Sequence, residues 1–309
     1  MSDSKKPKSS WAERSQSIQH TRAVPFVYFE WKCEQLSELL EQWAFLDILG
    51  HIGRLTIIVA IFFYFYESES RQKAKHYQAW QVINSAQGKP GSGGRMDALQ
   101  DLNRDGISLV GVDISGAFLP ELNLENAKLE RANISGADLY DSNLAGAKLL
   151  IANLSEAELE RANLSGTDFY DANLVRADLS GADLSGAELI KSNLSEVRFY
   201  DANLSGAKIL NANLTGAKLY YTNLVGANLS EAELAGAEFI GADLRKANLH
   251  DIKNWQAIQS IELANIYNVV NPPEGFIEWA KENGAVSIES KQEWIQILSQ
   301  KRQEKAKEK

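Results

Sequence analysis

A period of five residues dominates the middle of this sequence. From Leu109 to Leu249, every fifth residue is Leu, Ile or Phe at all 29 positions. The residue two places earlier is Ala at 21 of them, and the residue between is polar everywhere except at Phe118. This period fits neither the 3.6-residue repeat of a helix nor the two-residue alternation of a strand. The backbone must therefore return to the same environment once every five residues.

A square coil meets this requirement, with one short extended stretch and one corner in each pentad. Four pentads then form one turn, so residues 20 apart stack, and the periodic Leu and Ala positions point inward. Ser-Gly pairs such as Ser135-Gly136 follow the central residue, where they suit a corner. The sequence therefore predicts an all-β solenoid of about seven coils over residues 107–250, roughly 35 Å long at ~4.8 Å per coil.

Individual pentads carry a family resemblance. Ala-Asn-Leu-Ser-Gly at 162–166 and Ala-Asp-Leu-Ser-Gly at 182–186 resemble the A(D/N)LXX unit of pentapeptide-repeat proteins. The resemblance covers most of the region from 107 to 250 and implies a right-handed quadrilateral β-helix. It implies almost nothing about activity, because the repeat is specific for the fold.

The outward positions divide the expected coil into two kinds of face. Asn precedes the central residue on two opposite faces, which are otherwise rich in Ser and Gly. The other two faces carry bulky outward residues, which make up the candidate interaction surface: Leu150, Ile151, Tyr170, Ile190 and Leu210 on one, and Tyr140, Tyr200, Tyr220 and Tyr221 on the other. Contiguous exposed apolar surface usually marks an interface, so a docked partner is one interpretation. Contact with flanking helices or scattered surface apolarity is the other.

The amino-terminal third contains a strongly apolar run. We expect a disordered tail over 1–25 and a helical region over 26–86, with a membrane segment at about 45–66. The apolar residues of this segment are Leu55, Ile57, Ile58, Val59, Ile61, Phe62, Phe63 and Phe65. A single-pass span is the main interpretation. An interfacial segment or a buried helix remains open, because the uncharged run of 12 residues is shorter than the about 20 that a spanning helix needs.

Basic residues follow the apolar run, at Arg71, Lys73 and Lys75, whereas only Arg54 lies close before it. Positive charge near a span favours the cytoplasmic side, so the repeat domain is expected there. A membrane-like segment followed by HYQAWQVINSAQG (76–88) resembles membrane-anchored pentapeptide-repeat proteins of the cyanobacterial type. That resemblance implies no assigned chemistry.

Helices are expected to close the two ends of the solenoid. A Gly-rich linker over 87–94 leads to a capping helix over 95–106, and residues 251–309 read as C-terminal capping helices. Solenoid ends need such caps because their first and last coils present unpaired backbone groups. A homodimer contact through the terminal helices is the alternative use of the same segments.

Residue types that support catalysis or metal binding are sparse. Cys33 is the single cysteine, and the four histidines lie far apart in the sequence without nearby catalytic partners. The glycines of the linker lack the Lys-Ser/Thr ending of a phosphate-binding loop. We therefore expect neither an enzyme nor a bound cofactor or metal. A net charge of −9 also argues against direct binding to nucleic acid.

Two functions remain for a chain of this kind. The first is a membrane-anchored scaffold that presents the solenoid to an unknown protein partner. The second follows from the family resemblance, because some pentapeptide-repeat proteins mimic duplex DNA and bind a type II topoisomerase such as gyrase. Residues 106–250 carry 20 acidic and 11 basic residues, which suits such a mimic in net charge, although the basic residues interrupt any continuous acidic stripe.

Overall fold

The computed structural model describes residues 24–41, 50–88 and 91–307. The chain divides into two compact units, Met1–Ala74 and Lys75–Lys309. Most of the tail expected over 1–25 lies outside the described residues, as do positions 89 and 90 of the linker. Residues 24 and 25 are not part of a tail, because they open the first described helix.

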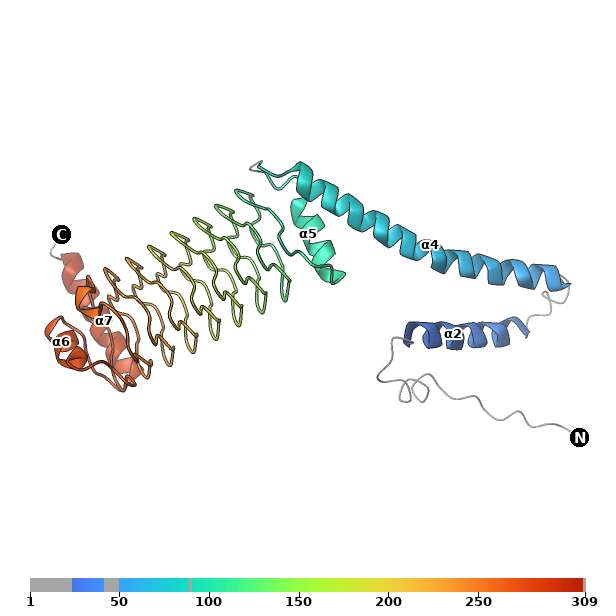
Figure 1. Ribbon diagram of the computed structural model, residues 1–309. Helices are drawn as coiled ribbons and strands as arrows, with labels where there is room; N and C mark the ends of the chain where they lie inside the picture. Colours follow the sequence, from blue (N-terminus) through green and yellow to red (C-terminus); the bar gives the residue numbers. More distant parts are fainter. Residues whose placement is uncertain (1–23, 42–49, 89–90, 308–309) are drawn as a thin grey trace, which may run out of the picture. The chain divides into compact units, whose positions relative to one another are not determined.

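Two helices make up the described part of the amino-terminal region (Figure 1). Helix α2 comprises Val24–Glu41, and helix α4 comprises the 36 residues Gly50–Ser85. The apolar run lies in the first half of α4, and the polar sequence after residue 66 continues the same helix. Leu55, Ile57 and Phe65 belong to α4, but their side chains lie outside the described residues.

The expected single-pass membrane span is wrong. Within residues 24–41, 50–88 and 91–307, no helix combines the length and the apolar character that a bilayer crossing requires. Helix α4 is long enough, but its apolar run of 55–66 extends only about 18 Å, against about 30 Å of hydrocarbon. Arg54 and Glu67 bound the run on either side, so it cannot be lengthened without placing charge in the bilayer. The cytoplasmic placement expected for the repeat domain depended on that span and is withdrawn with it.

The repeat region forms a square coil whose strands are single parallel bridges between residues 20 apart (Figure 1). These bridges run from Asp113–Asn133 to Glu233–Lys253. From Val112 onward, each central residue and the residue two before it are buried, as Leu184 and Ala182 show with no exposed surface. The backbone N–H of Leu184 donates to the Asn203 carbonyl at 2.7 Å, and the N–H of Asn203 donates to the Ala182 carbonyl at 2.9 Å. The core is thus a continuous apolar column enclosed by hydrogen-bonded backbone.

Four faces follow from this geometry, and we number them by their central residues. Face one contains Leu109 and every twentieth residue to Leu249, and faces two, three and four begin at Ile114, Leu119 and Leu124. Faces one and three lie opposite each other, as do faces two and four. We call the residue after each central residue the outward position and the next residue the corner position.

Every corner position from residue 111 to residue 251 has a positive φ. Glycine occupies 12 of these 29 corners, so left-handed backbone is imposed on 17 residues with side chains. Asn and Asp tolerate this conformation better than other non-glycine residues do, whereas a β-branched residue is disfavoured there. The corner conformation is therefore set by the coil and not by the local residue.

Asparagine ladders give faces two and four their flat surface. Asn153 on face two accepts hydrogen bonds from the Ser155 backbone N–H at 3.2 Å and from Asn173 Nδ2 at 3.0 Å. Its own Nδ2 donates to Asn133 Oδ1 at 3.3 Å. Each side-chain amide therefore fixes its own corner and joins two coils, which explains why Asn recurs at this position.

Helices close the amino-terminal end of the solenoid. Helix α5, Arg95–Arg104, buries Leu99 and Leu102 completely against the first coil. The last turns of α4 add Ile83, which is 1% exposed. Asn123 donates its backbone N–H to Gln100 Oε1 at 3.1 Å, so polar contacts accompany the apolar closure.

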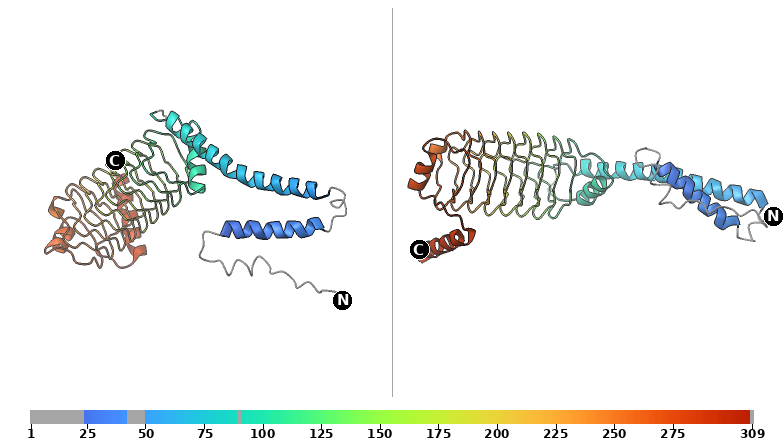
Figure 2. Two further views of the ribbon diagram at one scale, coloured as in Figure 1. Left: turned by 45° about the vertical axis from the view of Figure 1, so that its right-hand side comes forward. Right: turned by 90° about the horizontal axis from the view of Figure 1, so that it is seen from below.

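The carboxyl-terminal end changes register and then closes. The 3-10 helix η1, Trp255–Ala257, adds two residues at one corner, so that Glu238 pairs with Ser260, 22 residues later. Helix α6, Phe276–Glu282, places Phe276 against the core at 2% exposure. Helix α7, Lys291–Lys307, was also expected at this end, but it lies along the side of the last coils (Figure 2).

Candidate interaction surface

An apolar stripe runs along face one. The outward positions of successive coils carry Val110, Leu150, Tyr170, Ile190 and Leu210, interrupted by Glu130. Val110 is 49% exposed and Tyr170 is 36% exposed, whereas the three aliphatic residues between and after them are half-buried. Val110 was not among the residues predicted for this surface, but its distance of 40 residues from Leu150 places it in the same ladder.

Ile151 is the most unusual member of this stripe. It occupies the corner next to Leu150, with a φ of 57°, and its side chain is 51% exposed. Left-handed backbone costs a β-branched residue roughly 1–2 kcal/mol relative to the usual conformations. Half of the side chain lies in solvent, so burial recovers only part of that cost. A strained and exposed apolar residue of this kind points to a binding role.

Tyr170 is held in place by a cation from the next coil. Lys191 Nζ donates to the Tyr170 hydroxyl at 3.1 Å and lies 5.5 Å from the ring centroid. The hydrogen bond to Tyr170 raises the pKa of Lys191 above its usual value. The ring therefore has a fixed orientation on the surface, and less conformational entropy is lost when a partner covers it.

Face three repeats this arrangement at Tyr140. Arg161 Nη1 donates to the Tyr140 hydroxyl at 2.8 Å, and its guanidinium carbon lies 5.3 Å from the ring centroid. Asp141 pairs with Arg161 Nε at 2.9 Å. Tyr140 is 38% exposed, so the contact orients the ring without covering it.

Tyr200 and Tyr220 form a second aromatic group on face three. Their ring centroids lie 5.0 Å apart with an interplanar angle of 27°, as the spacing of adjacent coils dictates. The Tyr220 hydroxyl donates to the Glu238 carboxylate. Burial, followed by that carboxylate, raises the pKa of Tyr220 far above its usual value. Both tyrosines are half-buried, so they form a packed surface ladder.

Tyr221 does not belong to an open stripe. It occupies a corner with a φ of 58°, and its ring lies where a Cβ on Gly241 would approach it to 2.6 Å. Leu298 of α7 packs against the same glycine, and Trp294 Nε1 donates to the Leu263 carbonyl at 3.0 Å. Of the nine residues predicted for the interaction surface, Tyr221 is thus the one that contributes to the seat of α7.

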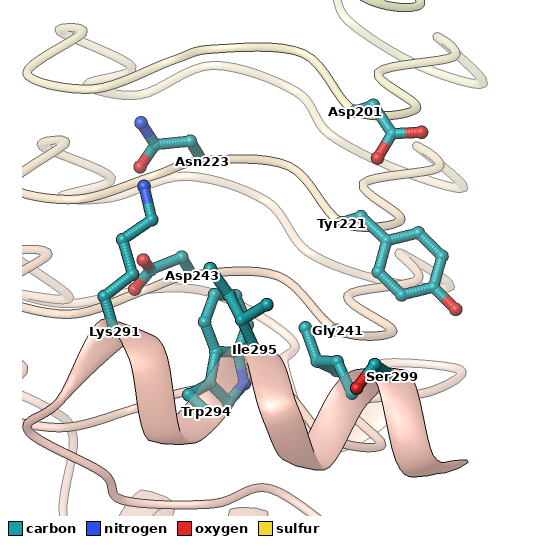
Figure 3. Close-up of a pocket in the computed structure, with 10 residues that line it drawn as sticks. Asp201, Tyr221, Asn223, Gly241, Asp243, Lys291, Trp294, Ile295 and Ser299 are labelled. Atoms are coloured by element: carbon teal, nitrogen blue, oxygen red, sulfur yellow. The ribbon is translucent and has the colours of Figure 1, made fainter. Parts of the chain in front are cut away.

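A cleft of about 300 Å³ opens between α7 and face four (Figure 3). Asn223 and Asp243 of the flat face form its floor, and Lys291 and Ile295 of α7 form one wall. Asp243 is 3% exposed and pairs with Arg245 at 2.7 Å. The last coils of face four thus accommodate a helix along their side.

Acidic residues concentrate on face three. Its eight acidic residues stand against three basic ones, a net charge of −5: Glu121, Asp138, Asp141, Glu158, Glu160, Asp178, Asp201 and Glu238 against Arg161, Arg198 and Lys218. Burial and the neighbouring Asp178 raise the pKa of Glu160. Burial alone would raise the pKa of Asp178, but hydrogen bonds donated by Ser180 and Arg198 outweigh it and lower the pKa below its usual value. Ion pairs such as Asp178–Arg198, at 2.8 Å, neutralise part of this face.

The described His, Cys, Asp and Glu side chains do not gather into a set of metal ligands. Within residues 24–41, 50–88 and 91–307, no group of three or more His, Cys, Asp or Glu side chains is placed to hold a metal ion. His76 lies 2.7 Å from Asp105 and Lys75 lies 2.9 Å from Asp101, so these polar groups join α4 to the region of α5. They act as structural contacts between helices.

Comparison with known proteins identifies the repeat. A family model described as Pentapeptide repeats (8 copies) matches residues 107–146, 137–174, 152–189, 172–209 and 212–251. This chain carries pentapeptide repeats. The repeats imply a right-handed quadrilateral β-helix, in agreement with the four faces described above. The region predicted to form the solenoid, residues 107–250, is therefore the pentapeptide-repeat rod.

Solved pentapeptide-repeat structures resemble parts of the chain. HetL, involved in heterocyst differentiation regulation in the cyanobacterium Nostoc sp. strain PCC 7120, is 28% identical over 56% of this chain and 78% of its own, with a TM-score of 0.30. A pentapeptide-repeat protein from the cyanobacterium Cyanothece 51142 is 31% identical over 46% and 93%, with a TM-score of 0.27. QnrB1, a plasmid-mediated fluoroquinolone resistance protein, is 20% identical over 50% and 83%, with a TM-score of 0.29.

Comparison with curated proteins gives no match. The membrane-anchored cyanobacterial type that the amino-terminal sequence resembles is not shown by any of these findings. The pentapeptide-repeat rod and its faces are thus the part of the chain from which function can be argued.

Proposed function

We propose that this protein is a non-enzymatic binding protein whose pentapeptide-repeat rod presents face one to a protein partner. The observation that carries the proposal is the outward apolar stripe, in which Val110, Ile151 and Tyr170 are exposed and Leu150, Ile190 and Leu210 are half-buried. The solenoid core does not need these side chains, because its own column of Leu and Ala is complete. Charged residues flank the stripe on both sides, as at the rim of an interface.

The strain at Ile151 strengthens this argument. A Gly or Asn at this corner would relieve the left-handed backbone, and both residues occupy other corners of the same rod. Ile151 instead extends the apolar stripe sideways by one side chain and remains 51% exposed. Retention of such a residue is explained if a partner covers it.

The test compares two double variants of the full chain as baits. Tyr170→Ser with Leu210→Ser breaks the stripe, whereas Val175→Ser with Thr215→Ser changes outward positions of face two and serves as the control. We expect cross-linking in extracts of the source cells to show partners that the wild type and the control retain and the stripe variant loses. Loss of no partner from the stripe variant, or equal loss from both variants, would rule out face one.

A second candidate rests on the acidity of face three. A net charge of −5 on one face suits a mimic of DNA that binds a type II topoisomerase such as gyrase. This candidate predicts inhibition of gyrase supercoiling by the purified chain, and weaker inhibition at higher salt. Reversal of Asp138 and Glu158 to Lys should abolish the effect, and the absence of inhibition at a large excess of protein would eliminate the candidate.

A further inference from the structure

The first half of helix α4 exposes a second apolar surface, separate from the rod. Ile58, Val59, Phe62, Phe63 and Tyr66 are 62%, 42%, 60%, 56% and 66% exposed. Their spacing places all five within an arc of about 140° at about 100° per residue. Phe62 stacks on Tyr66, with ring centroids 6.4 Å apart and an interplanar angle of 14°. We call these five residues the α4 stripe.

The described side chains on the other side of the helix are partly covered. Ile61 is half-buried, and Tyr64, although 63% exposed, lies beneath Arg71, whose guanidinium carbon is 5.4 Å from the ring centroid. The α4 stripe is therefore the face of the helix on which the exposed aliphatic and Phe side chains gather. One further helix is enough to cover such a face.

We infer that the α4 stripe is a self-association surface, on which two copies of this chain pair through α4 in antiparallel orientation. The exposed part of the five side chains amounts to about 500 Å² per copy, because an aromatic side chain buries about 150–250 Å² in full. Two copies would therefore bury about 1,000 Å², the lower limit for a specific interface, which suits a reversible dimer.

Charge at the ends of the apolar run selects the orientation. Arg54 precedes the run, and Glu67 and Glu69 follow it. An antiparallel pair brings position 54 of one copy beside positions 67 and 69 of the second, so opposite charges meet at both ends. A parallel pair would instead place Arg54 beside Arg54 and the acidic residues beside each other, which is unfavourable.

The first experiment measures the oligomeric state of the full chain by sedimentation equilibrium in lipid-free and detergent-free buffer. We expect a reversible dimer for the wild type. Phe62→Glu places like charges at the centre of the pair and should raise the dimer dissociation constant about 100-fold or more. Tyr77→Glu is the matched control, since Tyr77 is a 66% exposed aromatic residue on the same helix outside the stripe. It should leave the dissociation constant unchanged.

A charge-reversal set tests the orientation without altering the stripe. Arg54→Glu alone, and Glu67→Arg with Glu69→Arg, should each raise the dissociation constant about threefold to tenfold. The three changes together should restore it. This set also keeps the proposal testable if Phe62→Glu perturbs the helix, which circular dichroism would reveal.

Four results would overturn the proposal. They are a wild type that stays monomeric at all concentrations, an oligomer larger than a dimer, a dimer insensitive to Phe62→Glu, and a triple charge variant that remains weakened. Flotation of monomeric wild type with vesicles of phosphatidylcholine and phosphatidylglycerol would show that the stripe meets a lipid surface and not a second copy. That outcome would also overturn the proposal.

Discussion

At the scale of single residues, the corner is the position where the conformation that the coil requires differs from the one that most residues prefer. Each corner demands a left-handed backbone, and glycine, Asn or Asp meets that demand at little cost. Arg, Glu, Lys, Tyr and Ile meet it elsewhere in the same rod because the ladder hydrogen bonds on both sides of the corner hold it. The residue type at a corner can therefore vary with the needs of the protein surface, because the backbone there does not depend on it.

Ile151→Asn should stabilise the protein by about 1 kcal/mol, because Asn accepts left-handed backbone that a β-branched residue resists. Chemical denaturation followed by circular dichroism measures the change. Gly206→Ala is the converse control, since its corner has a φ of 67° with no atom within 4 Å of a new Cβ. It should lose about 1 kcal/mol. Unchanged stability in Ile151→Asn would show that the coil imposes no strain at this corner.

The register of the pentads was predictable residue by residue, and the special positions were not. Spacing alone placed Leu184 inside the rod and Tyr170 on its surface, because a period of five with four sides fixes which way each side chain points. Spacing could not show that Lys191 holds the Tyr170 ring or that Tyr221 lies under a helix. Those contacts join residues whose separation follows no repeat.

At the scale of elements, α7 shows how a flat face recruits a helix. Trp294 and Leu298 of α7 reach the backbone of the last coils. Arg245, an outward residue of face four, binds the segment just before α7, because its Nη1 donates to the Glu289 carbonyl at 2.9 Å. A helix was predictable within residues 251–309, but its position along the side of the rod was not, because a sequence pattern does not show which face a helix will contact.

Gly241→Ala should loosen α7, since a Cβ there would lie 2.6 Å from the Tyr221 ring and 3.2 Å from Leu298. We expect a loss of about 2–4 kcal/mol, from left-handed backbone and overpacking together. Hydrogen exchange over residues 291–301 should accelerate in this variant. Gly206 has the same left-handed backbone without these contacts, so Gly206→Ala should leave hydrogen exchange in α7 unchanged. Faster exchange in both variants would show that the contacts at Gly241 do not hold α7.

At the scale of the whole molecule, composition was a sound guide to the rod and a poor one to the amino-terminal helix α4. The pentapeptide-repeat rod is a continuous core in which each coil supports its neighbours. The run of 55–66 resembles a membrane span in composition, and the wrong prediction of a span rested on that resemblance. Composition counts apolar residues, whereas a bilayer also demands length, and the charges at Arg54 and Glu67 end the run too early.

Leu184→Asp should disrupt the rod cooperatively, because it places a carboxylate in a column where Leu184 has no exposed surface. We expect a loss of more than about 4 kcal/mol, or failure to fold. Ser185→Asp changes the next residue, which is half-buried on the surface, and should alter stability by about 0.5 kcal/mol or less. Thermal unfolding of both full-length variants measures the contrast, and a native-like transition in Leu184→Asp would contradict a dry, shared core.

The asparagine ladders determine how this protein can change in length. Amides such as Asn153 donate to the coil before and accept from the coil after, so the ladder has a direction. Insertion of one pentad would rotate every later Asn onto a neighbouring face, whereas insertion of 20 residues would return each to its own ladder. The rod can therefore gain or lose sequence only in whole turns of 20 residues. Smaller insertions are confined to corners, as at Trp255–Ala257, where two extra residues leave the pairing of the faces unchanged.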